Sequence, residues 1–320
     1  MLIDDLRVHC REGWRDWFGE ATPSRIDLAF TPSRARSSER AVAMVFSGGE
    51  LRAVLKLAKT EQDDLRREGQ VLRFLSDRHS ALSDVIPHVL GEGCEEVRRQ
   101  SSTEPPGRVL LLPLRPVGGR LWRPPAPELA ISGRPFSRVE RVLWRLDELL
   151  DQLNAFPSQP DVSPLGVDWR IGSDLLRLDA HARMWLQTYY HAEGQTVGLG
   201  RLSHGDLAPG NVRLSSSGVR AILDWELLDT GYEPWFDRLY PPLLAMSLAL
   251  VRGLPLPATS WPLRWLAVLT DEPSQVPLRV RCLRVTAELA SRSVLLRRRS
   301  VDQWAVLARY LQEMGELAEG

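Results

Sequence analysis

Two oxygen-bearing side chains lie close together in the segment S-H-G-D-L-A-P-G-N-V, which begins at Ser203. They are Asp206 and Asn211. Gly205 precedes them and Pro209 lies between them, and both residue types interrupt regular helices. A loop of this composition can direct the two side chains into one pocket, where their oxygen atoms suit a hard metal ion.

A second carboxylate, Asp224, follows a short apolar stretch downstream of Asn211. Residues 215–218 predict a turn, so that residues 212–214 and 219–223 can pair as a hairpin. The hairpin would bring Asn211 and Asp224 side by side. Two such ligands, completed by phosphate oxygens and water, suit Mg²⁺, which rarely takes a full set of protein ligands.

These residues resemble those of a known family. The sequence H-G-D-L-A-P-G-N-V followed by I-L-D-W-E is similar to the catalytic and metal loops of aminoglycoside phosphotransferases and choline or ethanolamine kinases. The resemblance implies an ATP- and Mg²⁺-dependent phosphotransferase with a small-molecule hydroxyl as acceptor. It implies that Asp206 accepts or orients the hydroxyl and that Asn211 and Asp224 hold Mg²⁺. It gives supporting roles to His204 in the loop and to Asp237 in W-F-D.

The resemblance also requires a lysine on the third strand, where it binds the ATP phosphates, and a helix glutamate that holds it. Lys56 in A-V-L-K-L matches the lysine, and Glu68 matches the glutamate, with Glu61 as the alternative. Lys56 and Lys59 are the only lysines among 41 basic residues. The retention of lysine in an arginine-rich chain supports the assignment, because arginine does not replace it at a tight phosphate site.

The remaining nucleotide-site features follow the family in part. The resemblance implies that the backbone of the strand containing Leu112 and Leu114 meets the adenine, and GTP is a possible second donor. The loop expected over the phosphates, residues 31–38, contains no glycine. Trp225 and Glu226 replace the Phe-Gly of the protein-kinase metal motif, and Glu226 is a candidate outer metal group.

The predicted secondary structure that positions these residues changes along the chain from strands to helices. Its first part is rich in strands, with one helix after the third strand and a leading helix within residues 1–20. Strands are predicted at residues 26–30, 41–46, 51–58, 85–90 and 109–114, and the inserted helix from residue 61. The later part is helical, with helices predicted over residues 139–156, 173–190 and 239–251.

The change of texture predicts two lobes. Residues 1–114 would form a nucleotide-binding lobe, and residues 138–320 a helical lobe that carries the catalytic and metal loops. Prolines and glycines cluster between them, over residues 115–137, as in a hinge or linker. The expected fold class is α+β, a two-lobed protein-kinase-like fold with a small antiparallel sheet in the first lobe.

Composition excludes several other classes of protein. The 41 basic and 41 acidic side chains cancel, whereas a nucleic-acid-binding protein usually has a basic excess. The three scattered cysteines match no zinc spacing and favour a reducing compartment. The start has no signal-peptide pattern, and the longest apolar run is too short to cross a membrane. We therefore expect a cytoplasmic protein without membrane insertion; the oligomeric state stays open.

The acceptor stays open at this point. A polycationic aminoglycoside would need an acidic groove. The stretch 139–180 contains more acidic residues than arginines, among them Asp147, Glu148, Asp151, Asp161, Asp168 and Asp174. A choline-like acceptor would need an aromatic cage, for which Trp169 and Trp235 are candidates. A hydroxyl on a sugar or another natural product is slightly favoured.

Two other functional classes are compatible with parts of the sequence. A catalytically inactive pseudokinase that serves as a binding or scaffold module is the alternative, and the glycine-free loop is its main support. The intact set of Lys56, Asp206, Asn211 and Asp224 argues against it. A protein kinase is disfavoured, because no A-P-E marker follows Asp224 and Asp237 comes too soon after it for a long activation loop.

Overall fold

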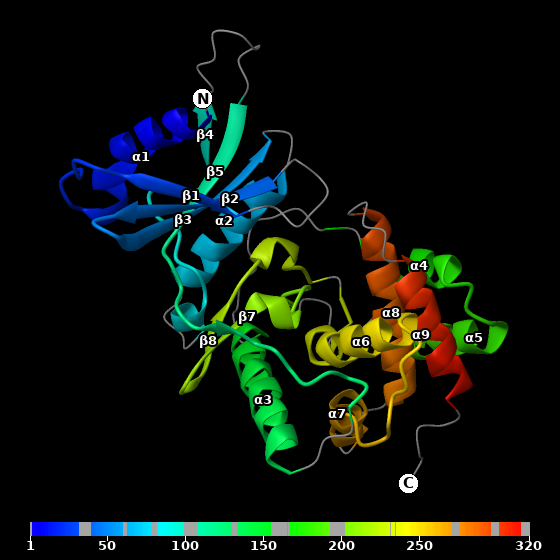
Figure 1. Ribbon diagram of the computed structural model, residues 1–320. Helices are drawn as coiled ribbons and strands as arrows, with labels where there is room; N and C mark the ends of the chain where they lie inside the picture. The colour runs from blue at the N-terminus through cyan, green and yellow to red at the C-terminus, as the bar shows by residue number, and fades with distance from the viewer. Residues whose placement is uncertain are drawn as a thin grey trace. The chain divides into compact units, whose positions relative to one another are not determined.

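The structure is a computed structural model, shown in Figure 1. It describes residues 2–31, 40–59, 63–77, 82–98, 108–129, 133–154, 165, 167–192, 202–230, 232–233, 235–270, 276–295 and 301–314. The chain divides into two compact units. The N-terminal unit comprises Met1–Arg120, Pro160–Val162 and Arg220–Glu226, and the C-terminal unit comprises Leu121–Gln159, Ser163–Val219 and Leu227–Gly320.

The N-terminal unit is built on a five-stranded antiparallel sheet with the strand order β1-β2-β3-β5-β4. Its strands are β1 (Asp27–Thr31), β2 (Arg40–Ser47), β3 (Glu50–Lys59), β4 (Glu95–Arg98) and β5 (Arg108–Leu114). Four of the five predicted strands are confirmed with small shifts at their ends. In β2 and β3 buried residues alternate with less buried ones, whereas β5 is a continuous buried apolar run. Both patterns are typical of strands, which is why they were predictable from the sequence.

The prediction of a strand at residues 85–90 is wrong. Ser83–Val85 forms a short 3-10 turn, η1, and Val89 makes an isolated bridge to Leu114. Among the residues that the structure describes, residues 85–87 are buried without strand pairing, and only His88 and Leu90, which flank the bridge, share backbone hydrogen bonds with residues 113 and 115. Burial rather than regular pairing therefore produced the apolar pattern. The strand that the prediction missed is β4, at the edge of the sheet, with the charged sequence E-E-V-R. Charged side chains are typical of edge strands and give no apolar signal.

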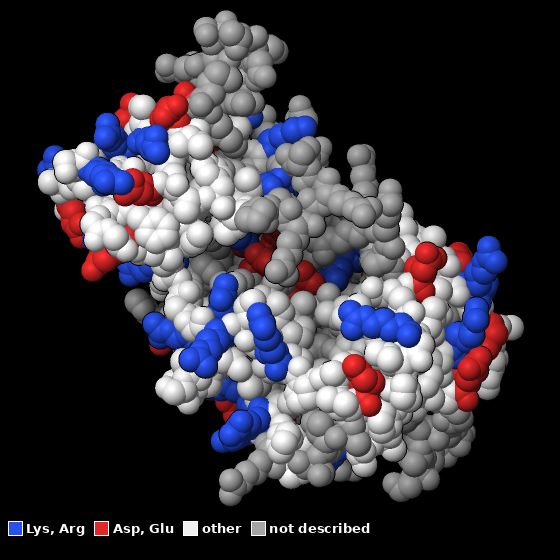
Figure 2. All heavy atoms as spheres, in the orientation of Figure 1, with Lys and Arg blue, Asp and Glu red and all other residues white. Residues whose placement is uncertain are grey.

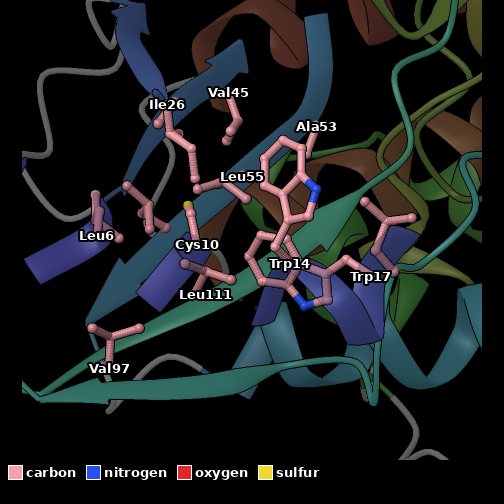
Figure 3. Close-up of a cluster of buried hydrophobic side chains, with 13 residues drawn as sticks. Leu6, Cys10, Trp14, Trp17, Ile26, Val45, Ala53, Leu55, Val97 and Leu111 are labelled. Atoms are coloured by element: carbon pink, nitrogen blue, oxygen red, sulfur yellow. The ribbon is translucent and has the colours of Figure 1, made fainter. Parts of the chain in front are cut away.

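Helix α1 (Leu2–Phe18) packs its apolar side against this sheet, which confirms the leading helix. Leu6, Cys10, Trp14 and Trp17 repeat at helical spacing on that side, and Figure 3 shows them directed toward the sheet around Leu55. All five residues are at most 6% exposed. The burial of this helix face is a main source of stability for the unit.

Helix α2 (Asp63–Ser76) confirms the helix predicted after the third strand and lies against β3 and β5. Its apolar residues Leu65, Val71, Leu72 and Leu75 are at most 6% exposed. This packing fixes the rotation of the helix and therefore the direction of its remaining side chains.

The C-terminal unit is mainly helical, as predicted. Its helices are α3 (Arg134–Asn154), α4 (Trp169–Leu175), α5 (Ala180–Ala192), α6 (Phe236–Val251), α7 (Trp261–Thr270), α8 (Leu278–Leu295) and α9 (Val301–Glu313). Helix α8 is central, since it contacts α4, α5, α6, α7 and α9 (Figure 1). Almost all of its residues are buried, including charged ones.

The single helix predicted over residues 173–190 is wrong, because the chain forms two helices there, α4 and α5. Between them Arg177 adopts a left-handed conformation with φ of 53°. The carboxylate of Asp179 then accepts a hydrogen bond of 2.7 Å from the backbone N–H of Ala182, as a helix N-cap does. The apolar spacing continues across this break, so periodicity alone could not detect it.

A smaller sheet has the strand order β6-β7-β8, with β6 (Arg120–Leu121), β7 (Val212–Ser215) and β8 (Gly218–Ile222). The pairing of β7 with β8 confirms the predicted hairpin. Two 3-10 turns flank it, η2 (Pro209–Asn211) and η3 (Trp225–Leu227). The motif residues therefore lie on short turns at the ends of strands rather than inside regular elements.

Basic and acidic side chains are interspersed on the face of the molecule shown in Figure 2, in keeping with the balanced composition. Within the described part of the chain, no helix has both the length and the apolar character needed to cross a membrane.

Candidate active site

Lys56 on β3 forms an ion pair with Glu68 on α2 inside the N-terminal unit. Its Nζ donates to both carboxylate oxygens, at 2.7 and 2.8 Å. The Glu68 side chain is fully buried, whereas 21% of the Lys56 side chain is exposed. The geometry therefore selects Glu68 as the partner of Lys56; Glu61, the alternative, lies outside the described residues.

Asp224 also belongs to the N-terminal unit, and its Oδ1 accepts a hydrogen bond from Lys56 Nζ. Burial by itself would lower the pKa of Lys56, but the charges of Glu68 and Asp224 outweigh it and raise that pKa. Asp224 has a φ of 57°, in the left-handed region that residues other than glycine seldom adopt. Such conformations are concentrated at functional sites.

Glu226, a candidate outer metal group, is engaged by arginine instead. Arg40, the first residue of β2, donates to a Glu226 oxygen at 2.8 Å and also pairs with Asp64 on α2. Burial raises the pKa of Glu226, and the charge of Arg40 opposes that effect. Of the expected phosphate loop, Thr31 ends β1, and residues 32–38 lie outside the described part of the chain.

The segment around Asp206 is braced by Asp237 inside the C-terminal unit. The two oxygens of Asp237 accept the backbone N–H groups of His204 at 2.6 Å and Gly205 at 3.0 Å. His204 Nδ1 in turn accepts the backbone N–H of Asp206 at 3.1 Å. Burial raises the pKa of Asp237 to about 7, although both backbone donors lower it. The contacts hold the backbone of this segment, and the supporting roles of His204 and Asp237 in catalysis stay predictions.

Gly205 has no room for a side chain. Its φ is +79°, and a Cβ atom would lie 2.4 Å from the backbone oxygen of Leu227. Only glycine combines this conformation with so close an approach of the backbone. The glycine therefore sets the path of the chain into Asp206.

Asp206 is half-buried and is contacted by three side chains of its own unit. Asn211 Nδ2 donates to the backbone oxygen of Asp206 at 2.9 Å and lies 3.3 Å from Oδ2. Tyr240 Oη donates to Oδ1 at 2.7 Å, and Arg292 Nη2 lies 3.4 Å from the same oxygen. The sequence predicted the first neighbour and missed the other two. Tyr240 and Arg292 lie on distant helices, and one buried arginine gives no signal in an arginine-rich chain.

Leu112 and Leu114 lie in β5, opposite Lys56 and Val54 of β3. Both leucines are buried, at 0% and 4% exposure. The Cδ1 atom of Leu112 is 3.2 Å from the Cβ position of Gly69, so its side chain fills the space between β5 and α2. Contact of this strand with adenine stays a prediction.

The chemistry of Asn211 and Asp224 fits Mg²⁺. Because Asn211 Nδ2 donates to the Asp206 backbone, its amide oxygen is the atom left for a cation. The side chain of Asp224 is 44% exposed and supplies carboxylate oxygens. The two residues belong to different units, so their binding of one ion stays a prediction.

Solved structures with a similar fold share little sequence with this chain. An aminoglycoside phosphotransferase in its apo form, a thermostable mutant, aligns with a TM-score of 0.54 and 15% identity over 94% of this chain and 97% of its own. A choline kinase from Streptococcus pneumoniae aligns with a TM-score of 0.52 and 11% identity over 96% and 99%. An ADP-bound aminoglycoside phosphotransferase aligns with a TM-score of 0.51 and 12% identity over 97% of this chain and 99% of its own. At such identities the likeness establishes the protein-kinase-like fold.

Among proteins with curated functions, none matches this sequence. The pattern that defines the phosphotransferase enzyme family matches residues 31–237, which span the strand of Lys56, the loop of Asp206 and the turn of Asp224. The match covers more than half of the chain, and the fold agrees with it. The chain therefore belongs to the phosphotransferase enzyme family of protein-kinase-like small-molecule kinases.

Proposed function

We propose that this enzyme transfers the γ-phosphate of ATP, with Mg²⁺, to a hydroxyl group of a small uncharged molecule. The observation that carries the proposal is the position of Lys56, one of two lysines in the chain, between the carboxylates of Glu68 and Asp224. Family membership supplies the phosphotransferase class. GTP is the second donor to test.

On this proposal Lys56 binds phosphate oxygens of the nucleotide, and Glu68 holds its ammonium group in place. The backbone of the strand that contains Leu112 and Leu114 would meet the adenine. Asn211 and Asp224 would hold Mg²⁺, which when bound neutralises charge on the phosphates. Lys56 is in direct contact with Asp224, so the residue proposed to bind phosphate lies beside a residue proposed to hold the metal.

Asp206 would align the acceptor hydroxyl and receive its proton. The acceptor oxygen forms a bond to the γ-phosphorus, and the bond from that phosphorus to the β-phosphate oxygen breaks. ADP leaves with the electron pair of the broken bond, while the hydroxyl proton passes to the Asp206 carboxylate. Positioning and charge neutralisation account for most catalysis of this kind, so no covalent intermediate is needed.

Charge pairing in the C-terminal unit favours an uncharged acceptor over a polycation. Five of the eight acidic residues of the stretch 139–180 pair with nearby arginines, and Asp161 lies outside the described residues. The pairs are Asp147 and Asp151 with Arg238, Glu148 with Arg145, Asp168 with Arg170, and Asp174 with Arg183. The exposed pairs are weak, but the side chains of Asp147 and Arg238 are only 9% and 17% exposed. A cationic ligand would have to break that desolvated pair.

The candidate aromatic residues are likewise covered by cations of the chain itself. The guanidinium carbon of Arg284 lies 5.0 Å from the Trp169 ring centre, and that of Arg281 lies 4.4 Å from the Trp235 ring centre. These arginines occupy the ring faces that a quaternary ammonium ligand would use. The arrangement therefore favours a sugar or natural-product hydroxyl over a choline-like acceptor.

Nucleotide binding is tested first, by the melting temperature of the protein with ATP and Mg²⁺ beside the Asp224→Ala variant. Ligand at about a hundredfold its dissociation constant adds roughly 2.7 kcal/mol of stability. A Mg²⁺-dependent shift that the variant lacks supports the proposal. No shift with ATP or GTP contradicts it and favours a binding module.

Phosphate transfer separates an active enzyme from a pseudokinase. Labelled ATP is incubated with neutral polyols and sugars, with an aminoglycoside and with choline, using Asp206→Asn as the inactive control. We expect transfer to a neutral acceptor and a loss of about a hundredfold or more in the variant. Transfer only to the aminoglycoside or choline would reject the proposed acceptor class. If the protein binds nucleotide but transfers phosphate neither to an acceptor nor to water, the pseudokinase is favoured.

A further inference from the structure

The Oδ1 atom of Asp206 is held from two sides. Tyr240 Oη donates to it at 2.7 Å, and Arg292 Nη2 lies 3.4 Å away. Arg292 Nη2 also donates to Tyr240 Oη at 3.2 Å, so the three groups form a closed triangle. The second carboxylate oxygen, Oδ2, has the 3.3 Å contact with Asn211.

Packed helices fix both donors. Tyr240 follows Phe236 by one turn of α6, and the two rings stack with centroids 5.8 Å apart. The guanidinium carbon of Arg292, on α8, lies 5.8 and 5.1 Å from these ring centres. Tyr240 and Arg292 are only 4% and 5% exposed. Side chains confined in this way can hold the carboxylate in one orientation.

Stability does not explain the buried arginine. Removing a guanidinium from water is costly, and an apolar residue of similar size is often as stable or more so. Moreover, Arg292 Nη1 is buried and has no hydrogen-bond partner among the described residues. A buried donor left in this state calls for a reason other than stability. Its neighbour Nη2, directed at Asp206, indicates that reason.

We propose that Tyr240 and Arg292 are positioning residues that fix Oδ1 of Asp206, so that Oδ2 receives the acceptor hydroxyl. The inference rests on the proposed phosphotransferase function. Because both donors act on the same oxygen, each restricts rotation of the carboxylate. Asn211 limits the position of Oδ2 from the other side, and the loop of Gly205 fixes the backbone.

The first test is Tyr240→Phe, which removes one oxygen atom. Hydrolysis of Mg·ATP, with water as the acceptor, gives kcat and the KM for ATP. We expect kcat to fall about tenfold to a hundredfold, while the KM for ATP changes little, because the nucleotide contacts belong to other residues. Tyr232→Phe is the matched control. The Tyr232 ring packs against the same Phe236 at a tilt, with ring centroids 4.3 Å apart, and its buried hydroxyl has no hydrogen-bond partner among the described residues.

A second test distinguishes charge from packing at Arg292. Arg292→Met should lower kcat by a similar factor, and Arg292→Lys should recover part of it because the cation returns. An unchanged kcat in Tyr240→Phe, or an equal loss in Tyr232→Phe, would overturn the positioning role. A lysine variant no better than the methionine variant would remove Arg292 from it.

A thermodynamic cycle keeps the inference separate from the proposed function. Melting temperatures of Tyr240→Phe, Asp206→Asn and the double variant show whether the two side chains interact. We expect the tyrosine substitution to cost less when Asp206 is already changed. Additive losses would overturn the contact itself. If the unmodified chain turns over no ATP, the catalytic role fails together with the proposed function, whereas the cycle still reports the contact.

Discussion

Lys56 and Asp224 are in direct contact, although they lie far apart in the sequence. The lysine ammonium donates to the Asp224 carboxylate and to both oxygens of Glu68. The ammonium therefore sits between two carboxylates, one of them fully buried. Glu68 and Asp224 together fix the orientation of the ammonium group.

Replacement of Lys56 by methionine should abolish the stabilisation by ATP and reduce turnover by at least about a hundredfold. The substitution removes the cation that binds the phosphates, and it leaves the buried Glu68 carboxylate without its ammonium partner. The matched control is Lys59→Met, at the exposed end of the same strand. Melting curves with and without Mg·ATP give the first result, and labelled phosphate transfer gives the second. Equal effects of the two substitutions would contradict the role of Lys56.

Gly205→Ala should disable the enzyme and lower its stability by at least about 1 kcal/mol. The added Cβ would meet a backbone oxygen at 2.4 Å, so the loop that carries Asp206 would have to move. Gly210→Ala in the same loop is the control, since its Cβ would enter open space at an ordinary backbone angle. Denaturant titration and turnover are measured on both. A fully active Gly205→Ala variant would show that the loop is not constrained as described.

Gly172→Ala should destabilise the C-terminal unit by about 2 kcal/mol or more. Helices α4 and α8 approach so closely that a Cβ at this glycine would overlap the backbone oxygen of Ala287, at 1.7 Å. The separation of the helices would shift α8 and with it Arg292. Thermal unfolding of the variant, compared with Gly118→Ala at an open position, measures the cost. Equal melting temperatures would reject the close helix contact.

The stability of the C-terminal unit should decrease as the pH rises toward about 7. Burial raises the pKa of Asp237 from its ordinary value to about 7, so the folded state keeps a proton that the unfolded chain releases. The stabilisation linked to this proton is complete at acidic pH and is lost as the pH passes through the folded-state value. Burial also raises the pKa of Glu233 to about 7, so this carboxyl likewise makes the folded state less stable as the pH rises.

Urea titrations at about pH 5 and about pH 8 test this dependence on the unmodified chain and on Asp237→Asn. The variant lacks the titrating group, so its unfolding free energy should change less between the two pH values. A variant with an unchanged pH dependence would assign the effect to other groups.

The sequence determined the class of this protein because the residues of its motifs are close together along the chain. The spacing of Asp206, Asn211 and Asp224, together with Lys56 on an apolar strand, is sufficient to indicate a phosphotransferase. Strands and helices with a regular apolar face were also predictable, because their periodicity is a local property. The charged edge strand β4 carries no such period, and the apolar spacing continues across the break between α4 and α5, so periodicity could find neither feature.

Tertiary structure alone decided which groups touch the motif residues. Tyr240 and Arg292 reach Asp206 from α6 and α8, and Arg40 reaches Glu226 from the start of β2. These contacts join positions separated by many residues, and nothing in the local sequence distinguishes these arginines from the others in the chain. Their role depends on burial and on helix packing, which exist only once the chain has folded.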